Sequence, residues 1–150
     1  MKQSNLVAAA FLGLALAGCA SSGGLSGADR LALYRSHAGE PVNSFHFNGS
    51  FLGWTELGDS ALALQTRPNE SWLIELSGPC PGLEHSMGIG LTSRMNQVSI
   101  RFDKVLVRDG IPGGCPIATI RPLDVKALKA DIRKLREASA AERPDEGGNG

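Results

Sequence analysis

The chain has 150 residues, with 15 Lys and Arg against 15 Asp and Glu, and 42% of its residues are hydrophobic. This length allows one domain, and this share of apolar residues excludes a wholly disordered chain. The zero net charge argues against a nucleic-acid partner, because binding to phosphates requires a basic excess.

The N-terminus has the pattern of an export signal. Met1 and Lys2 begin a weakly positive segment, and residues 6–16 are an uncharged run of apolar or small residues. A membrane-spanning helix needs about 20 such residues, so this run fits the apolar core of a secretory signal peptide. We therefore exclude residues 1–18 from the predicted fold.

The apolar run ends in Leu16-Ala17-Gly18-Cys19, which resembles the lipobox of bacterial lipoproteins. The resemblance implies that the signal peptide is cleaved before Cys19 and that Cys19 carries the lipid. Two or more acyl chains anchor a protein stably to a bilayer, whereas one chain holds it only marginally. The alternative is an ordinary secretory signal with an incidental cysteine.

The residues after Cys19 bear on localisation. Ala20 and Ser21 stand where Gram-negative lipoproteins retained in the inner membrane usually carry Asp. The resemblance therefore implies an anchor in the outer membrane and a domain that faces the periplasm. Residues 19–28 are small and rich in Gly and Ser, so we expect a flexible tether.

Residues 29–138 are expected to form one globular domain. A short helix is predicted over residues 29–36, capped by Asp29. Apolar residues then alternate with polar ones, which is typical of strands, between turns rich in Gly, Pro and Asp. Strands are expected at 44–48, 51–57, 61–66, 71–76, 89–93, 98–102, 105–108 and 115–121. We predict a mainly β fold, a small antiparallel barrel or roll of seven to eight short strands.

A C-terminal amphipathic helix completes the predicted domain. Asp124 is its expected N-cap, and the apolar residues Val125, Leu128, Ile132 and Leu135 recur at helical spacing, so this stripe should lie on the sheet. The other positions are mostly basic, which indicates a solvated face or a contact with anionic headgroups or a partner helix. We expect disorder over residues 139–150.

Two cysteines remain besides Cys19. Cys80 and Cys115 form an even pair in a compartment expected to be oxidising, which predicts one disulfide. A redox-active pair is the alternative, although such cysteines usually lie close together in sequence. A metal site using Cys80, His85 and Cys115 is also conceivable, but zinc ligands normally show tighter spacing.

Candidates for catalysis are few. Ser50 and Ser60 lie at turn-like positions and no nucleophile elbow is present. His37, His46 and His85 are expected at the surface or in hydrogen bonds, and Asp103 suits a turn or a bulge. The aromatic residues Phe45, Phe47, Phe51, Trp54 and Trp72 either form the β core or line a ligand cleft. We predict no catalytic, cofactor or metal site.

The domain itself resembles a family of Gram-negative lipoproteins known only as a domain of unknown function. The resemblance spans roughly residues 40–125 and rests on Gly53-Trp54, Leu57-Gly58-Asp59, Trp72-Leu73-Ile74-Glu75-Leu76, Phe102-Asp103-Lys104-Val105, Cys115-Pro116-Ile117 and Ile120-Arg121-Pro122-Leu123. It implies a fold type and a compartment, but no activity.

The favoured function is a lipid-anchored envelope protein with a non-catalytic binding or scaffold module. Its expected partners are the membrane, through the anchor, and an envelope protein or small ligand. One alternative is an envelope hydrolase that uses His46 or His85 with Asp103. The other is a thiol-redox protein that uses Cys80 and Cys115.

Overall fold

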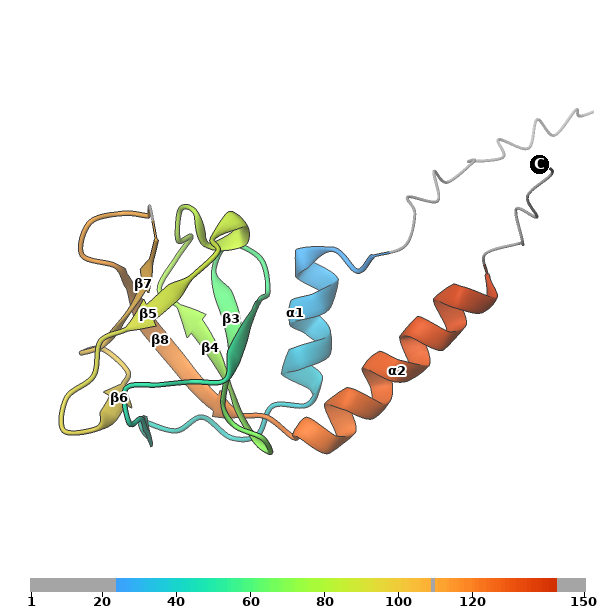
Figure 1. Cartoon of the computed structure of the whole chain (residues 1–150), viewed down its shortest axis with the longest axis horizontal. Helices are drawn as coiled ribbons and strands as arrows, with labels where there is room; N and C mark the ends of the chain where they lie inside the picture. The colour runs from blue at the N-terminus through green and yellow to red at the C-terminus, as the bar shows by residue number, and fades with distance from the viewer. Residues whose placement is uncertain (1–23, 109, 143–150) are drawn as a thin grey trace, which may run out of the picture.

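The computed structural model describes residues 24–108 and 110–142 (Figure 1). Its helical elements are α1 (Gly27–Ser36), the 3-10 turn η1 (Leu83–His85) and α2 (Val125–Ala141). Its strands are β1 (Ser44–His46), β2 (Gly53–Glu56), β3 (Ala61–Arg67), β4 (Glu70–Leu76), β5 (Ile89–Leu91), β6 (Gln97–Ser99), β7 (Lys104–Val107) and β8 (Cys115–Pro122). The signal peptide and the lipobox with Cys19 lie outside the described residues.

The strands form two antiparallel sheets, which confirms the predicted mainly β fold. Six strands follow the order β2-β3-β4-β8-β7-β5 in a curled half-barrel, and β1 pairs with β6. Strand β8 is long enough to pair with β4 from Ile117 to Pro122 and with β7 at Cys115 and Pro116. A bridge from Val42 to Ile120 joins β8 to the segment that leads into β1. These pairings roll the sheets around a shared interior.

The interior of the roll is the larger of two hydrophobic cores. Leu62, Leu64 and Ile74 point into it from the central strands and are fully buried. Phe45 stacks on Trp72 there, with ring centroids 4.9 Å apart. This packing confirms that the aromatic residues belong mainly to the core of the β structure.

A second core lies on the opposite face of the sheet, under the two helices. Successive side chains of a strand point to opposite faces, so Ala63 and Leu73 face away from the roll. They pack with Leu57, Leu123 and Leu128, and the helices cover this face (Figure 1). The central strands are therefore buried on both faces, which explains why the first four residues of β3 are all apolar and all buried.

Most predicted strands are confirmed within one or two residues, but the strand expected at 98–102 is wrong in its second half. β6 ends at Ser99, and residues 100–102 form a turn in which Arg101 has a positive φ of 71°. Phe102 is consequently 67% exposed instead of buried. The strand expected at 89–93 is also shorter, since β5 ends at Leu91.

Both helices differ slightly from the sequence prediction. Helix α1 begins at Gly27, and its N-cap is Ser26 instead of Asp29. The Ser26 hydroxyl accepts a hydrogen bond from the Asp29 N–H in the first turn, at 3.1 Å. Gly27 and Ala28 are thus helical and not part of the tether. Asp124 is confirmed as the N-cap of α2. That helix continues to Ala141, beyond the start of the tail expected at residue 139.

In the described part of the chain, neither helix is long and apolar enough to cross a membrane.

Candidate functional site

The best candidate site is a cleft of about 590 Å³ between α2, the side chain of Tyr34 on α1 and the outer face of strands β2 to β4. Its volume falls within the range of roughly 300–1,000 Å³ that is usual for small-molecule sites. The lining residues are Tyr34, Gly53, Trp54, Thr55, Ala63, Gln65, Ser71, Leu123, Val125, Leu128, Lys129, Ile132, Arg133 and Arg136.

Small residues on the sheet create this cleft. The strand register places Gly53 beside Gln65, Thr55 beside Ala63 and Gln65 beside Ser71, so these side chains share the outer face. None of them is a large apolar residue that would fill the space under a helix. The helix therefore cannot pack flush against this part of the sheet, and a hollow remains.

Helix α2 supplies the opposite wall with two adjacent rows of side chains. Leu128 and Ile132 are four residues apart and pack toward the second core, between the sheet and the helices, which we call the outer core. Lys129 and Arg133 are also four residues apart, one position further along, and Arg136 follows three residues later; all three border the cleft. The helix thus presents an apolar row, Leu128 and Ile132, deep in the cleft, and a basic row that is exposed to solvent at its mouth.

The cleft carries the positive charges of Lys129, Arg133 and Arg136. Its lining contains no Asp, Glu or His, so no carboxylate in the lining balances these charges. Carboxylates on neighbouring elements have other partners: Glu56 pairs with Arg30, and Asp131 pairs with Lys134 and His37. In residues 24–108 and 110–142, the three cations of the cleft form no ion pair within 4.0 Å. The site is therefore apolar at its floor and positive at its mouth.

Ion pairs also hold the helices that frame the cleft. Arg30 on α1 pairs with Glu56 on β2, and Arg35 donates to Glu75 on β4 at 2.9 Å. His37, just after α1, lies 3.0 Å from Asp131 on α2. These contacts fix α1 on the sheet and join its end to α2, so they set the width of the cleft.

Asp103 is buried, but its hydrogen bonds give it a structural role. Its carboxylate accepts the Thr92 hydroxyl at 2.8 Å and the Ser99 N–H at 2.8 Å. The Thr92 hydroxyl in turn accepts the N–H of Lys104 at 2.9 Å. Asp103 therefore connects the ends of β5, β6 and β7 at the bend between two strands, as the turn prediction implied.

The structure does not bring the predicted hydrolase residues together. His46 lies on the exposed side of β1 and His85 is exposed in η1. Both carboxylate oxygens of Asp103 already accept hydrogen bonds from Thr92 and Ser99. Among the described residues, neither histidine hydrogen-bonds to Asp103, so no acid–base pair forms there.

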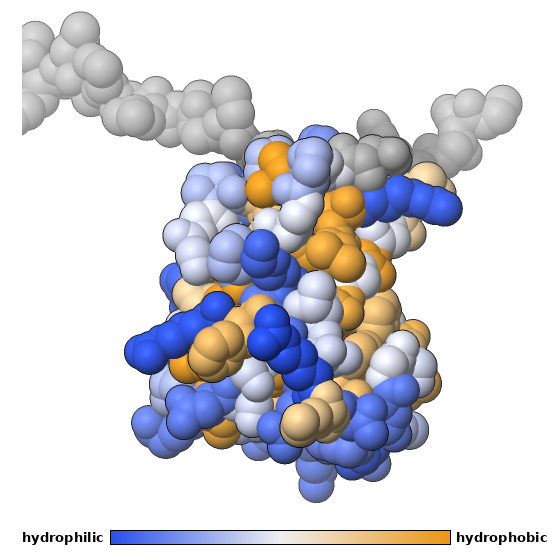
Figure 2. All heavy atoms as spheres, turned by 90° about the vertical axis from the view of Figure 1, so that its left-hand side faces the viewer, coloured by the Kyte–Doolittle hydropathy of each residue, from blue (hydrophilic) through white to orange (hydrophobic). Residues whose placement is uncertain are grey.

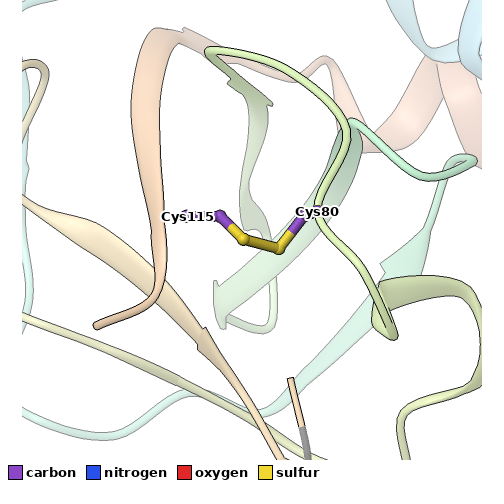
Figure 3. Close-up of a disulfide and its surroundings, with 2 residues drawn as sticks. All are labelled: Cys80 and Cys115. Atoms are coloured by element: carbon purple, nitrogen blue, oxygen red, sulfur yellow. A yellow bond between two sulfur atoms is a disulfide. The ribbon is translucent and has the colours of Figure 1, made fainter. Parts of the chain in front are cut away.

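The predicted disulfide between Cys80 and Cys115 is present and buried (Figure 3). It joins the segment after β4 to the first residue of β8, with a Cα–Cα distance of 5.8 Å. Gly114 has a φ of 74°, and a Cβ there would lie 2.7 Å from the Val105 carbonyl oxygen. Glycine at this position therefore allows β8 to approach β7 just before Cys115.

Burial of the disulfide argues against the redox alternative. Cys80 and Cys115 are only 1% and 3% exposed and belong to the inner core. A reactive disulfide must be reachable by an attacking thiolate. The bonded sulfurs are also not free thiolates, so the metal alternative with His85 loses two of its three ligands.

The face opposite the helices is a weaker candidate. It carries exposed apolar residues such as Phe102 and Leu106. Figure 2 shows that apolar surface on this side is interrupted by hydrophilic side chains. A contiguous apolar patch would mark an interaction surface, whereas scattered apolar residues need no functional explanation.

Sequence reasoning missed the cleft, although it identified the basic positions of the helix. The cleft combines residues from α1, three strands and α2 that are far apart in sequence. One signal was available: Gly53, Thr55, Ala63 and Ser71 place small side chains on one face of adjacent strands. Of the five aromatic residues that the sequence offers as core or cleft, only Trp54 belongs to this lining.

Residues 1–139 match a family described as a family of unknown function (DUF6491). Neither the curated proteins nor the solved structures gave a match.

Proposed function

The chain belongs to the DUF6491 family of unknown function, and from this premise we propose that it is a lipid-anchored envelope protein whose domain binds a ligand without catalysis. The lipid is carried by Cys19, and the anchor lies in the outer membrane with the domain facing the periplasm. The resemblance of Leu16-Ala17-Gly18-Cys19 to a lipobox supports the anchor. The buried disulfide fits an oxidising compartment.

The single observation that carries the binding role is the cleft under α2. It offers apolar surface and three cations, which are suited to holding a molecule in place. Chemistry at Ser71, the one serine in the lining, would need a base, and the lining supplies no imidazole or carboxylate. The geometry therefore favours binding over hydrolysis.

The anchor is tested by feeding expressing cells with radiolabelled palmitate. We expect label in the wild-type chain and none in Cys19→Ala, while the matched control with Cys80→Ser and Cys115→Ser keeps its label. Separation of the two membranes on a density gradient should place the wild-type chain in the outer membrane. Label retained by Cys19→Ala contradicts the anchor, and recovery in the inner membrane contradicts the proposed location.

The binding role is tested with a photo-crosslinking amino acid in place of Gln65, on the floor of the cleft. The control carries the same group in place of Asn48, which is exposed in the loop after β1. After irradiation of intact cells, the mass of the purified protein should show a defined adduct only for the Gln65 position. Equal adducts at both positions, or none at either, would reject the cleft as a binding site.

A further inference from the structure

We propose that the cleft binds an anionic amphiphile: one acyl chain that ends in a single negatively charged group, such as a carboxylate. This inference rests on the proposed binding role and names the class of its ligand. The structure assigns the chain to the apolar floor and the anionic group to the basic row of α2. Three observations carry the proposal.

The first observation is the shape and polarity of the floor. Ala63, Leu128 and Ile132 give it an apolar surface, and the small residues of β2 and β3 leave it open along the helix. An acyl chain gains about 0.8 kcal/mol for each methylene removed from water. A small hydrophilic anion would leave this apolar surface unused.

The second observation is the basic row. Lys129, Arg133 and Arg136 lie at the mouth of the same cleft and on one side of the helix. A bound anion would complement these three cations, which the lining itself leaves without a carboxylate. An uncharged lipid would make no use of them.

The third observation is the free apolar edge of the helix. Leu135 follows Leu128 and Ile132 on the apolar stripe but is 43% exposed, because the helix has passed the end of the outer core. A bound acyl chain would extend the apolar contact from Ile132 toward Leu135. The cleft and the exposed stripe are thus adjacent parts of one surface.

The test uses the full chain in phosphatidylcholine vesicles and stearate that carries a photoreactive diazirine. We expect adducts on peptides that contain Tyr34, Gln65 or Ile132, suppressed by excess unlabelled stearate. The uncharged probe, a diazirine stearyl alcohol, should give little labelling there. A triple variant with Lys129→Gln, Arg133→Gln and Arg136→Gln should need about tenfold more stearate for the same labelling, since each exposed charge contact contributes about 0.2–1 kcal/mol.

The matched control is Lys126→Gln, an exposed cation of the same helix that lies outside the cleft. It should label like the wild-type chain. All these side chains are exposed, so circular dichroism should show unchanged folding.

Several outcomes would overturn the proposal. Equal labelling by the alcohol would mean that the cleft selects apolar chains without regard to charge. Adducts spread over the β face would mean non-specific partitioning. Loss of binding to phosphatidylglycerol vesicles in the triple variant, without stearate labelling of the wild-type chain, would assign the cations to a membrane surface. An adduct at the Gln65 crosslinker without stearate labelling would reject this ligand class and leave the binding role intact.

Discussion

Asp103 shows that a buried carboxylate can serve the fold alone. It is 2% exposed, yet its two oxygens accept hydrogen bonds from Thr92 and Ser99. A buried charged group is tolerated when hydrogen bonds replace its hydration. These bonds tie together three short strand ends that share few ladder contacts, and this explains an acidic residue between the apolar residues Phe102 and Val105.

Replacement of Asp103 by Asn should destabilise the protein by about 1–3 kcal/mol, because one amide nitrogen would face a donor in the buried network. Chemical denaturation followed by circular dichroism measures this loss. Asp59→Asn, at an exposed turn, is the control and should stay within about 0.5 kcal/mol of the wild-type chain. A wild-type stability for Asp103→Asn would contradict the structural role.

The disulfide acts at the same scale. Its cysteines are 35 positions apart, so the bond restricts the unfolded chain by about 3.5–4 kcal/mol in the loop-entropy account. The double variant with Cys80→Ser and Cys115→Ser should melt at least about 5 °C below the oxidised wild-type chain in calorimetry. Addition of a reductant should lower the wild-type melting temperature but not that of the variant. If the two proteins melt together, the bond does not stabilise the fold.

At the scale of elements, α2 is an amphipathic helix that is longer than its docking surface. Leu128, near its start, is 6% exposed, whereas Leu135, two turns later, is 43% exposed. The sequence predicted the apolar stripe correctly, because its spacing is local. It could not show where the sheet ends beneath the helix, because that depends on strands more than fifty residues away.

The two leucines therefore make a matched pair. Leu128→Ala should cost about 2–4 kcal/mol, because it leaves a cavity in the outer core. Leu135→Ala should cost less than about 0.5 kcal/mol. Urea denaturation of both variants checks this difference. Similar losses would mean that the whole helix is docked and that the exposed edge does not exist.

The stabilisation that Asp131 gives to α2 should depend on pH. The hydrogen bond from Lys134 and its positive charge lower the pKa of Asp131 below its ordinary value of 3.8, and the hydrogen bond with His37 lowers it further. Because the folded pKa is depressed, this stabilisation is complete above pH 3.8 and is lost as the pH falls through the folded value.

Melting curves of Asp131→Asn and wild-type protein from pH 7 to pH 2 test this sign. The variant should melt lower at neutral pH, and the two curves should converge below pH 3.8. Glu137→Gln on the same helix serves as the control. A constant difference at every pH would assign the effect of the substitution to something other than ionisation.

At the scale of the molecule, the β fold could be predicted because each strand carries its own signal. Period two located strands such as β3 and β4, and Gly58 and Asp59 marked the turn between two of them. Hydrogen bonds between Arg94 and Gln97 close the turn between the strands expected at 89–93 and 98–102. The pairing order and the burial of β3 and β4 on both faces could not be predicted, since they depend on which elements meet.

The candidate site was less predictable for the same reason. The sequence identifies the basic positions of α2, but by itself their pattern is equally typical of a solvated helix face. Their role depends on the hollow formed by Thr55, Ala63 and Ser71 on other strands. A sequence records that these residues are small, but only the register places them under the helix.

The described chain begins shortly before α1, and Figure 1 draws α1 and α2 on the same side of the β structure. Five peptide units separate Gly24 from Cys19, a reach of at most about 18 Å. Acylation of Cys19 would therefore keep the side of the domain that carries α1 and α2 within a short distance of the leaflet. A fatty molecule leaving the leaflet would then have only a short aqueous gap to cross before capture.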